Sequence, residues 1–365
     1  RVFQMKRYPI AAMLILAVCM TVFGTGSTAR AELPETRVIT DTLGREVEIP
    51  VHIDRAVCVG VGALRYSCYV GAADRIIAVE EYETRPELSR LYSYVNAERF
   101  RSLPIIGGNG EPYPEELIAA DPQVIVMSTY AKTDPDTLSR QTGIPVVAIP
   151  GSDTVLDAKA YETIRILGIV FGKEERAAEL EQALDEIRQD LSRRTEAIPE
   201  EEKPTVYIAG VSFRGSHGFE GTEAYYGPLE LIHARNLANT TGQSSAFDCD
   251  PEQVLFWDPD VIFMDYNGMD LIRASWEQNP DYYLSLKAVR EGHIYTQISF
   301  RSFAANLDTA LADAYYAGCV LYPDAFSDIQ PEEKAGEIFE LLLGINPYPD
   351  LKEAGYEFCA ILPVE

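Results

Sequence analysis

Two stretches of the sequence share one pattern: YPEELIAADPQVI at residues 113–125 and DPEQVLFWDPDVI at residues 250–262. In each stretch a proline opens a short helical segment, an Asp-Pro pair ends it, and an apolar strand follows. A proline is tolerated in the first turn of a helix because its missing N–H has no intrahelical partner there. Since the same half-unit occurs twice, the sequence predicts two lobes of related construction.

Apolar runs alternate with helical patterns around both repeats. In the first half we expect strands at 56–60, 76–80, 105–107, 124–127 and 146–149, and helices at 63–70, 114–120 and 137–141. In the second half we expect strands at 205–209, 261–264 and 293–297, and helices at 228–234, 251–256, 307–322 and 331–343. A hairpin is expected at 38–50, around an Asp-Thr-Leu-Gly turn. This alternation is typical of parallel sheets with right-handed crossovers, so the sequence predicts the α/β class with two Rossmann-like lobes.

The middle of the chain, residues 154–195, has no strand pattern. Leucine and isoleucine recur there at helical spacing among charged residues, and Gly168 and Gly172 predict a kink or a break into two helices. We therefore expect a long α-helix to join the two lobes. The expected boundaries are 1–31 for a leader, 36–152 for the N-terminal lobe, 153–198 for the interdomain helix region, and 203–365 for the C-terminal lobe with its terminal helices.

The first residues have the order of a secretory signal. Lys6 and Arg7 precede an apolar run at 10–23, and small and polar residues end in Ala29-Arg30-Ala31. This order predicts export to the periplasm with cleavage after Ala31, and a retained membrane anchor is the alternative. Cys19 loosely resembles a lipidation site, but the bulky residue before it favours a soluble periplasmic product.

The charge and the cysteines narrow the possible partners. The formal net charge is −26 at pH 7, and such a surface repels nucleic acid phosphates. The same charge also keeps an exported protein soluble, whatever it binds. The five cysteines after the leader contain no C-x-x-C pair, so neither a zinc ribbon nor a redox motif is expected.

Several segments, in this order along the chain, resemble the substrate-binding proteins of iron-siderophore, haem and vitamin B12 ABC importers. They are TDTLGREV at 40–47, GAADRIIAV at 71–79, LGIVFGKEE at 167–175 and the two helices that end in Asp-Pro. The resemblance covers essentially all of the chain after the leader. It implies a rigid bilobed fold with the long helix as its spine and a ligand cleft between the lobes. It also implies a metal chelate as ligand, no intrinsic cofactor, and the transmembrane subunits of an ABC permease as partner.

In that family each lobe presents a surface glutamate that pairs with arginines of the permease. The matching positions are Glu115 and Glu252, which occupy equivalent places in the two repeats. Both fall in the first turn of an expected helix, where the helix dipole favours an acidic residue in any case. Their symmetric placement nevertheless favours docking, in which carboxylate–arginine pairs contribute orientation and association rate more than affinity.

The cleft of such a fold lies at the carboxyl ends of the strands, where loops rich in arginine and aromatic residues occur in this sequence. Arginine can clamp the acidic groups of a chelate through forked hydrogen bonds, and aromatic rings can cover an apolar face. His217 lies in a glycine-rich loop and could be an axial metal ligand or a hydrogen-bond donor. Each residue also has a structural interpretation: a surface ion pair for arginine, hinge packing for tyrosine, or a backbone contact for histidine. The expected ligand-binding residues are Arg65, Tyr82, Asn109, Tyr130, Arg214, His217, Tyr226, Tyr266, Phe300 and Arg301.

Other functions are compatible with only parts of the sequence. A bare zinc or manganese site needs clustered histidines, and the four histidines are spread along the chain. Gly60 and Gly62 follow a strand and Glu80 ends the next, as in dinucleotide-binding oxidoreductases, but Arg65 occupies the third glycine position. A hydrolase of the G-x-S-x-G type has no matching motif here.

We therefore expect no catalytic residues and no metal held by the protein itself. Two alternatives remain open for an exported protein of this architecture. One is a binding protein for an oxyanion such as molybdate. The other is an enzyme on the same architecture, either a chelatase that uses His217 and Glu223 as catalytic groups or a dinucleotide-dependent oxidoreductase, which the fold alone does not exclude.

Overall fold

The computed structural model describes residues 35–152 and 154–361, which belong to one compact unit. The expected leader at 1–31, its cleavage point after Ala31, and Cys19 lie outside the described residues. Within the described ranges, no helix combines the length and the apolar character that a membrane crossing requires.

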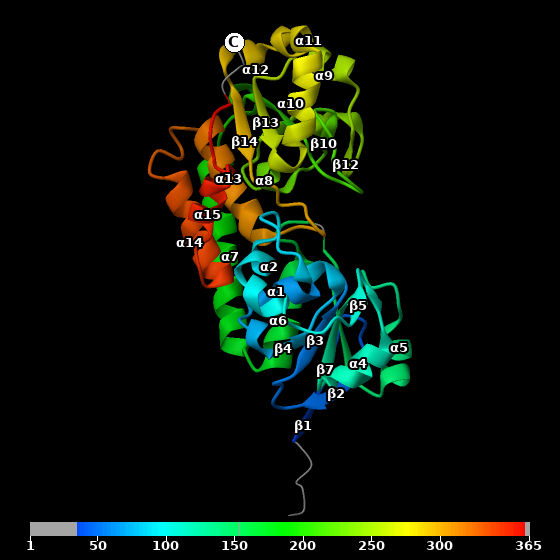
Figure 1. Ribbon diagram of the computed structural model, residues 1–365. Helices are drawn as coiled ribbons and strands as arrows, with labels where there is room; N and C mark the ends of the chain where they lie inside the picture. The colour runs from blue at the N-terminus through cyan, green and yellow to red at the C-terminus, as the bar shows by residue number, and fades with distance from the viewer. Residues whose placement is uncertain (1–34, 153, 362–365) are drawn as a thin grey trace, which may run out of the picture. The chain divides into compact units, whose positions relative to one another are not determined.

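The first half of the unit is built on a parallel sheet with the strand order β4-β3-β7-β8. Figure 1 labels β3, β4 and β7 of this sheet. All residues of β3, β7 and β8 are buried, as expected for parallel strands. The strands are β3 (Ala56–Val59), β4 (Ile76–Ala78), β7 (Val124–Ser128) and β8 (Val146–Ile149). The helices are α1 (Ala63–Tyr69), α2 (Leu91–Val95), α3 (Ala97–Phe100), α4 (Pro114–Ala120) and α5 (Pro135–Thr142).

The strand expected at 105–107 is the main difference in this half. Ile105 makes a single parallel bridge to Val79, and only Gly107–Gly108 (β5) pairs further, with β6 (Glu111–Pro112). A β-carbon at Gly107 would lie 2.5 Å from the carbonyl oxygen of Glu111, so this tight hairpin requires glycine there.

The second half repeats the design with the parallel strand order β11-β9-β13-β14. An antiparallel pair, β10 and β12, is added to it and was not expected from the sequence. The strands are β9 (Thr205–Ala209), β10 (Gly221–Glu223), β11 (Arg235–Asn236), β12 (Ala246–Asp248), β13 (Val261–Asp265) and β14 (Ile294–Gln297). The helices are α8 (Gly227–Glu230), α9 (Pro251–Trp257), α10 (Met269–Gln278), α11 (Pro280–Ser285) and α12 (Lys287–Glu291).

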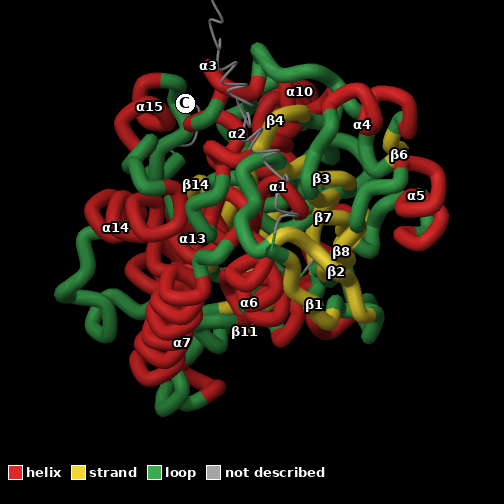
Figure 2. Tube along the Cα trace, turned by 90° about the horizontal axis from the view of Figure 1, so that it is seen from below, coloured by secondary structure: helices red, strands yellow, loops and turns green. Residues whose placement is uncertain are grey.

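The connection between the two sheets is a pair of helices, α6 (Ala158–Phe171) and α7 (Glu174–Thr195). Gly172 ends α6 in the left-handed conformation, with φ at +63°, so the expected long helix breaks there. Figure 2 shows α6 and α7 together with α13 (Leu307–Leu321) and α14 (Pro331–Leu343) on one side of the strands β3, β7 and β8. The architecture confirms the predicted α/β class with two lobes joined through a long helix.

The ends of the described chain are tied to the sheets. Strands β1 (Thr36–Thr40) and β2 (Glu46–Pro50) form the expected hairpin. The buried carboxylate of Asp41 accepts from the amide of Ala148 in β8 at 3.1 Å, which anchors the hairpin to the first sheet. Helix α15 (Tyr348–Glu353) follows α14, and Ala360 bridges to Tyr295 of β14. Short 3-10 helices cover Ala73–Arg75, Glu81–Thr84, Glu200–Glu202, Leu237–Thr241 and Tyr266–Gly268.

Candidate functional site

A cavity of about 970 Å³ lies between segments of the two lobes. The first lobe supplies Glu87 and Ser89, and Thr154 and Val155 follow its last strand, β8. The second lobe supplies loops that follow β9, β13 and β14, together with parts of 223–227 and 244–246. The cavity thus forms where the strands of a parallel sheet end, which is the usual place for a ligand in such folds.

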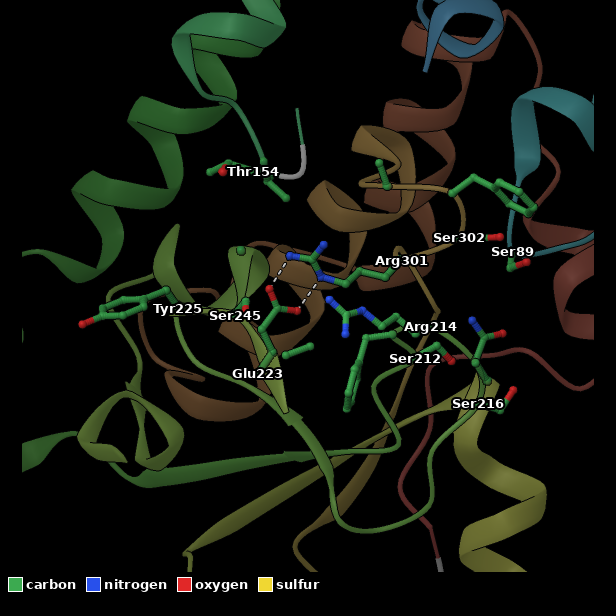
Figure 3. A pocket seen from close by; sticks show the side chains of 18 of the residues that line it. Ser89, Thr154, Ser212, Arg214, Ser216, Glu223, Tyr225, Ser245, Arg301 and Ser302 are labelled. Atoms are coloured by element: carbon green, nitrogen blue, oxygen red, sulfur yellow. Dashed lines mark hydrogen bonds and ion pairs between the residues drawn. The ribbon is translucent and has the colours of Figure 1, made fainter. Parts of the chain in front are cut away.

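Glu223 and Arg301, both in the lining, form an ion pair (Figure 3). Nε of Arg301 donates to Oε2 of Glu223 at 2.5 Å, and Nη2 donates to Oε1. Glu223 ends β10 and is only 2% exposed, whereas the side chain of Arg301 is 20% exposed. Arg301 was expected at the ligand site, but Glu223 was expected only under the chelatase alternative.

Arg214 is the second arginine of the cavity and differs from the first. It is exposed, its backbone is left-handed with φ at +52°, and it makes no ion pair with any of the described residues. Figure 3 shows its guanidinium on the same side of the cavity as the Arg301–Glu223 pair. An arginine without a partner beside a cavity can offer forked hydrogen bonds to an incoming carboxylate.

Hydroxyl groups make up much of the remaining lining. The hydroxyl of Ser212 is buried and has no hydrogen-bond partner within the described part of the chain. Because a buried polar group without a partner is costly, this hydroxyl marks a position where a ligand or water atom would be stabilised. The hydroxyl-bearing residues of the lining are Ser89, Thr154, Ser212, Ser216, Ser244, Ser245 and Ser302.

His217 supports the wall of the cavity but does not line it. Its Nδ1 lies 2.7 Å from Oδ1 of Asp248, and its Nε2 lies 2.8 Å from the carbonyl oxygen of Phe213. Its ring also stacks on Phe213, with centroids 3.7 Å apart, and Phe213 does line the cavity. Both ring nitrogens thus have a partner within the protein, and neither is directed into the cavity.

The same histidine belongs to a group that lies close enough together to hold an ion. Ligand atoms of His217, Glu220 and Asp248 all lie within 4.8 Å of one another. Asp248 is exposed, and exposed carboxylates gather in this way without a metal. The contacts of His217 therefore point to a role in holding the loop that contains Phe213 and Arg214.

Arg65 and Tyr82 act on the cavity indirectly. Arg65 is 1% exposed and donates to the carbonyl oxygens of Ala305, at 2.6 Å, and of Ser302, at 3.2 Å, so it fixes the loop that carries Arg301. The Tyr82 ring stacks on Phe303, a lining residue, with centroids 4.4 Å apart. These two contacts also join the first lobe to the second.

Five other expected residues lie elsewhere. Tyr226 and Phe300 are fully buried and pack edge to face at 5.1 Å, so they support the cavity from within the core. Tyr266 donates to the carbonyl oxygen of Glu357 at 2.7 Å and lines a separate cavity beside α10. Asn109 and Tyr130 are exposed in loops of the first lobe and are not among the lining residues.

The residues that suggested a dinucleotide site make a different structure. The carboxylate of Glu80 accepts from the amides of Gly60, at 2.8 Å, and Gly110, at 2.5 Å. Burial raises the pKa of Glu80, and these two amides partly offset that effect. Since both carboxylate oxygens already bind backbone amides, Glu80 ties two loops of the first lobe together.

Glu115 and Glu252 lie in the first turns of α4 and α9, and both are exposed. Neither makes an ion pair within the described ranges. The side chain of Asp250 already caps α9 through the amide of Glu252, at 2.9 Å, so Glu252 is not needed as a cap.

Comparison with known proteins agrees with this architecture. The family model described as "Periplasmic binding protein" matches residues 63–297, and the chain belongs to that family. Proteins of this family are the ligand-binding components of ABC transporters, which implies export and a cognate permease.

Similar proteins include the molybdate-binding protein MolA of Haemophilus influenzae, which is 24% identical over 86% of this chain and 93% of its own length. A periplasmic solute binding protein from Veillonella parvula shares the fold with a TM-score of 0.69, at 20% identity over 86% of this chain and 94% of that chain. An ABC transporter solute binding protein from Sulfurospirillum deleyianum has a TM-score of 0.65, at 23% identity over 87% of this chain and 98% of that chain.

Proposed function

We propose that this protein captures a hydrophilic, anionic iron chelate in the cavity between its lobes and delivers it to the transmembrane subunits of an ABC permease. The observation that carries this proposal is the composition of the cavity. It combines two arginines with a row of hydroxyl groups, and one of those hydroxyls, that of Ser212, has no partner within the described chain.

The size of the cavity favours a chelate over a simple anion. Ligand pockets of about 300–1,000 Å³ hold molecules the size of drugs, and this cavity measures about 970 Å³. A four-oxygen oxyanion would fill only a small part of it. Among the ligands that the family resemblance implies, the hydroxyl-rich lining suits a hydrophilic siderophore better than the apolar macrocycle of haem or a corrinoid.

Molybdate is the second candidate ligand, and one observation favours it. The relative from Haemophilus influenzae is named as a molybdate-binding protein and matches most of both chains. Under this candidate the ligand would occupy the part of the cavity nearest the two arginines.

Calorimetric titration of the ligand-free protein with molybdate and with ferric complexes of hydrophilic siderophores tests the proposal. We expect binding of at least one ferric chelate in the micromolar range or tighter. Absence of binding by all ferric chelates, together with tight binding of molybdate, would replace the first candidate with the second. An absorbance spectrum of protein purified from its source serves as an independent check, since a bound ferric chelate absorbs visible light.

Export and docking complete the proposal. The segment at 1–31 would direct secretion and be removed after Ala31, and Glu115 and Glu252 would contact arginines of the permease. Their equivalent positions in two related half-units support this assignment.

A further inference from the structure

The carboxylate of Glu223 is fixed inside the cavity. It is 2% exposed and bonded through both oxygens to Arg301, so it cannot turn away into water. A buried ion pair resists separation because either partner alone would be an uncompensated buried charge. A ligand that enters the cavity therefore meets both charges of this pair, the negative one as well as the positive one.

The charges of the described part of the lining balance. Among the described lining residues, Arg214 and Arg301 are cationic, and Glu87 and Glu223 are anionic. A cavity built to attract a bare dianion would be expected to carry an excess of positive charge. This cavity offers a positive group at Arg214 and a negative group at Glu223 instead.

Hydrogen bonding also discriminates between a bare anion and a ligand that carries donor groups. An ionised carboxylate accepts hydrogen bonds and donates none, and the same holds for a fully ionised oxyanion. Such an anion beside Arg301 would lie next to the Glu223 carboxylate and could donate no hydrogen bond to it. A ligand that carries hydroxyl or ammonium groups can donate to Glu223 while its acidic group binds Arg214.

We infer that Glu223 is a specificity-determining residue, which makes the cavity select anions that carry their own hydrogen-bond donors. The ligand class is hydroxyl-bearing carboxylates and their metal chelates, and acceptor-only oxyanions are rejected. The inference rests on the proposed function, because it assumes that this cavity is the capture site. Selectivity of this kind comes from a repulsive element as much as from an attractive one.

Replacing Glu223 with glutamine tests the inference, because the amide keeps the shape of the side chain and removes its charge. Wild-type protein and Glu223→Gln are titrated with sodium molybdate and with ferric gluconate, whose uncoordinated hydroxyls remain donors. We expect molybdate to bind Glu223→Gln about tenfold more tightly than wild type, since a like charge has been removed from its site. Ferric gluconate should bind the variant more weakly than wild type. Molybdate affinity that is unchanged or lower in a folded Glu223→Gln protein overturns the inference.

Two further variants show whether the gain in molybdate affinity depends on the position of Glu223 beside Arg301. Glu87→Gln removes the same charge from the same cavity, but Glu87 lies near Arg90 rather than Arg301. We expect its gain in molybdate affinity to be less than about threefold, as for a charge that is partly screened by solvent. In the double variant Glu223→Gln with Arg301→Gln the gain should disappear. An equal gain in Glu87→Gln would mean that net charge alone decides, and would also overturn the inference.

A comparison in wild-type protein avoids any effect of substitution on folding. Malate and succinate carry the same charge and differ by one hydroxyl, so malate should bind in the cavity more tightly than succinate. Equal affinities of the two acids would count against Glu223 as the selecting group. If the wild-type protein binds molybdate tightly, the cavity is still the capture site and only the inferred selectivity is wrong. If none of the probes binds, the proposed function is wrong as well.

Discussion

The three arginines that the sequence placed in the cleft have three different roles in the structure. Arg65 is buried and bonded to backbone carbonyls, Arg301 is paired with Glu223, and Arg214 alone is exposed without an ion-pair partner in the described chain. The sequence identifies an arginine in a loop after a strand, but its partner comes from a distant segment. Neither Ala305 nor Glu223 is near its arginine in the sequence, so the pattern could not separate the three cases.

Substitution of Arg214 and Arg65 should therefore have opposite consequences. Arg214→Ala should weaken chelate binding about tenfold or more, because its guanidinium is available for forked hydrogen bonds to the ligand. It should leave the melting temperature unchanged, because the exposed side chain makes no ion pair with the described residues. Arg65→Ala should lower the free energy of unfolding by about 3 kcal/mol, since it leaves buried carbonyls unpaired and opens a cavity. Titration of both variants measures their affinity for the chelate, and urea unfolding measures their free energy of unfolding. A melting temperature lowered equally in both would show that Arg214 is structural too.

Several buried acids give the stability a distinctive pH dependence, and Asp265 and Glu83 are two of them. Burial raises the pKa of Asp265 to about 7, partly offset by the Ser299 hydroxyl and the Asn267 amide, and burial also raises the pKa of Glu83 to about 7. In the unfolded chain both acids lose their protons near pH 4. Between about pH 4 and 7 the folded state thus holds more protons than the unfolded state, and stability falls as pH rises.

We therefore expect the free energy of unfolding to be greater at pH 5 than at pH 7.5. Asp265→Asn keeps hydrogen-bonding atoms at this position without an ionisable group. This substitution should reduce the slope of the free energy of unfolding against pH by about 1.4 kcal/mol per pH unit at the steepest point, which corresponds to about one proton. Urea unfolding of wild type and Asp265→Asn across this range gives both slopes. A slope identical in the two proteins contradicts a neutral Asp265 in the folded state.

At the scale of elements, the sequence predicted the long and strongly patterned segments. Strands β7, β9 and β13 and helices α4, α9, α13 and α14 all lie where the periodicity placed them. The pair β10 and β12 was missed because each strand has three residues, too few for an alternating pattern, and is defined by its partner. This omission mattered, because β10 carries Glu223.

The contact between α6 and α7 depends on Gly168. A β-carbon there would lie 2.6 Å from Cβ of Ala177 in α7, closer than two such carbons can approach. Gly168→Ala should thus lower the free energy of unfolding by about 1–3 kcal/mol, although alanine favours helix formation. Adding Ala177→Gly should recover part of the loss, because it removes the clash. Urea unfolding of the two single variants and the double variant measures this coupling, and strict additivity would argue against a direct contact.

At the scale of the whole described unit, the duplicated half-unit has two consequences. It places a parallel sheet on each side of the cavity, so segments of both lobes line it. It also gives each lobe an equivalent short helix, α4 or α9, with an exposed glutamate in its first turn. The fold was predictable from this repeat, whereas the lining depends on loops far apart in the sequence and was predicted only in part.

Docking is the prediction that belongs to this scale. Conversion of Glu115 and Glu252 to glutamine should reduce uptake of the ferric chelate, measured in proteoliposomes with the cognate permease, by about tenfold or more. Ligand affinity should be unchanged, because neither residue lines the cavity. The remaining uptake should depend less on salt, since exposed charge pairs act chiefly on orientation and association rate. Glu175 and Glu333 are the matched control, because they too are exposed in the first turns of helices, α7 and α14. If the control pair reduced uptake as much as Glu115 and Glu252, the loss would come from overall charge, and the assignment of docking to α4 and α9 would fail.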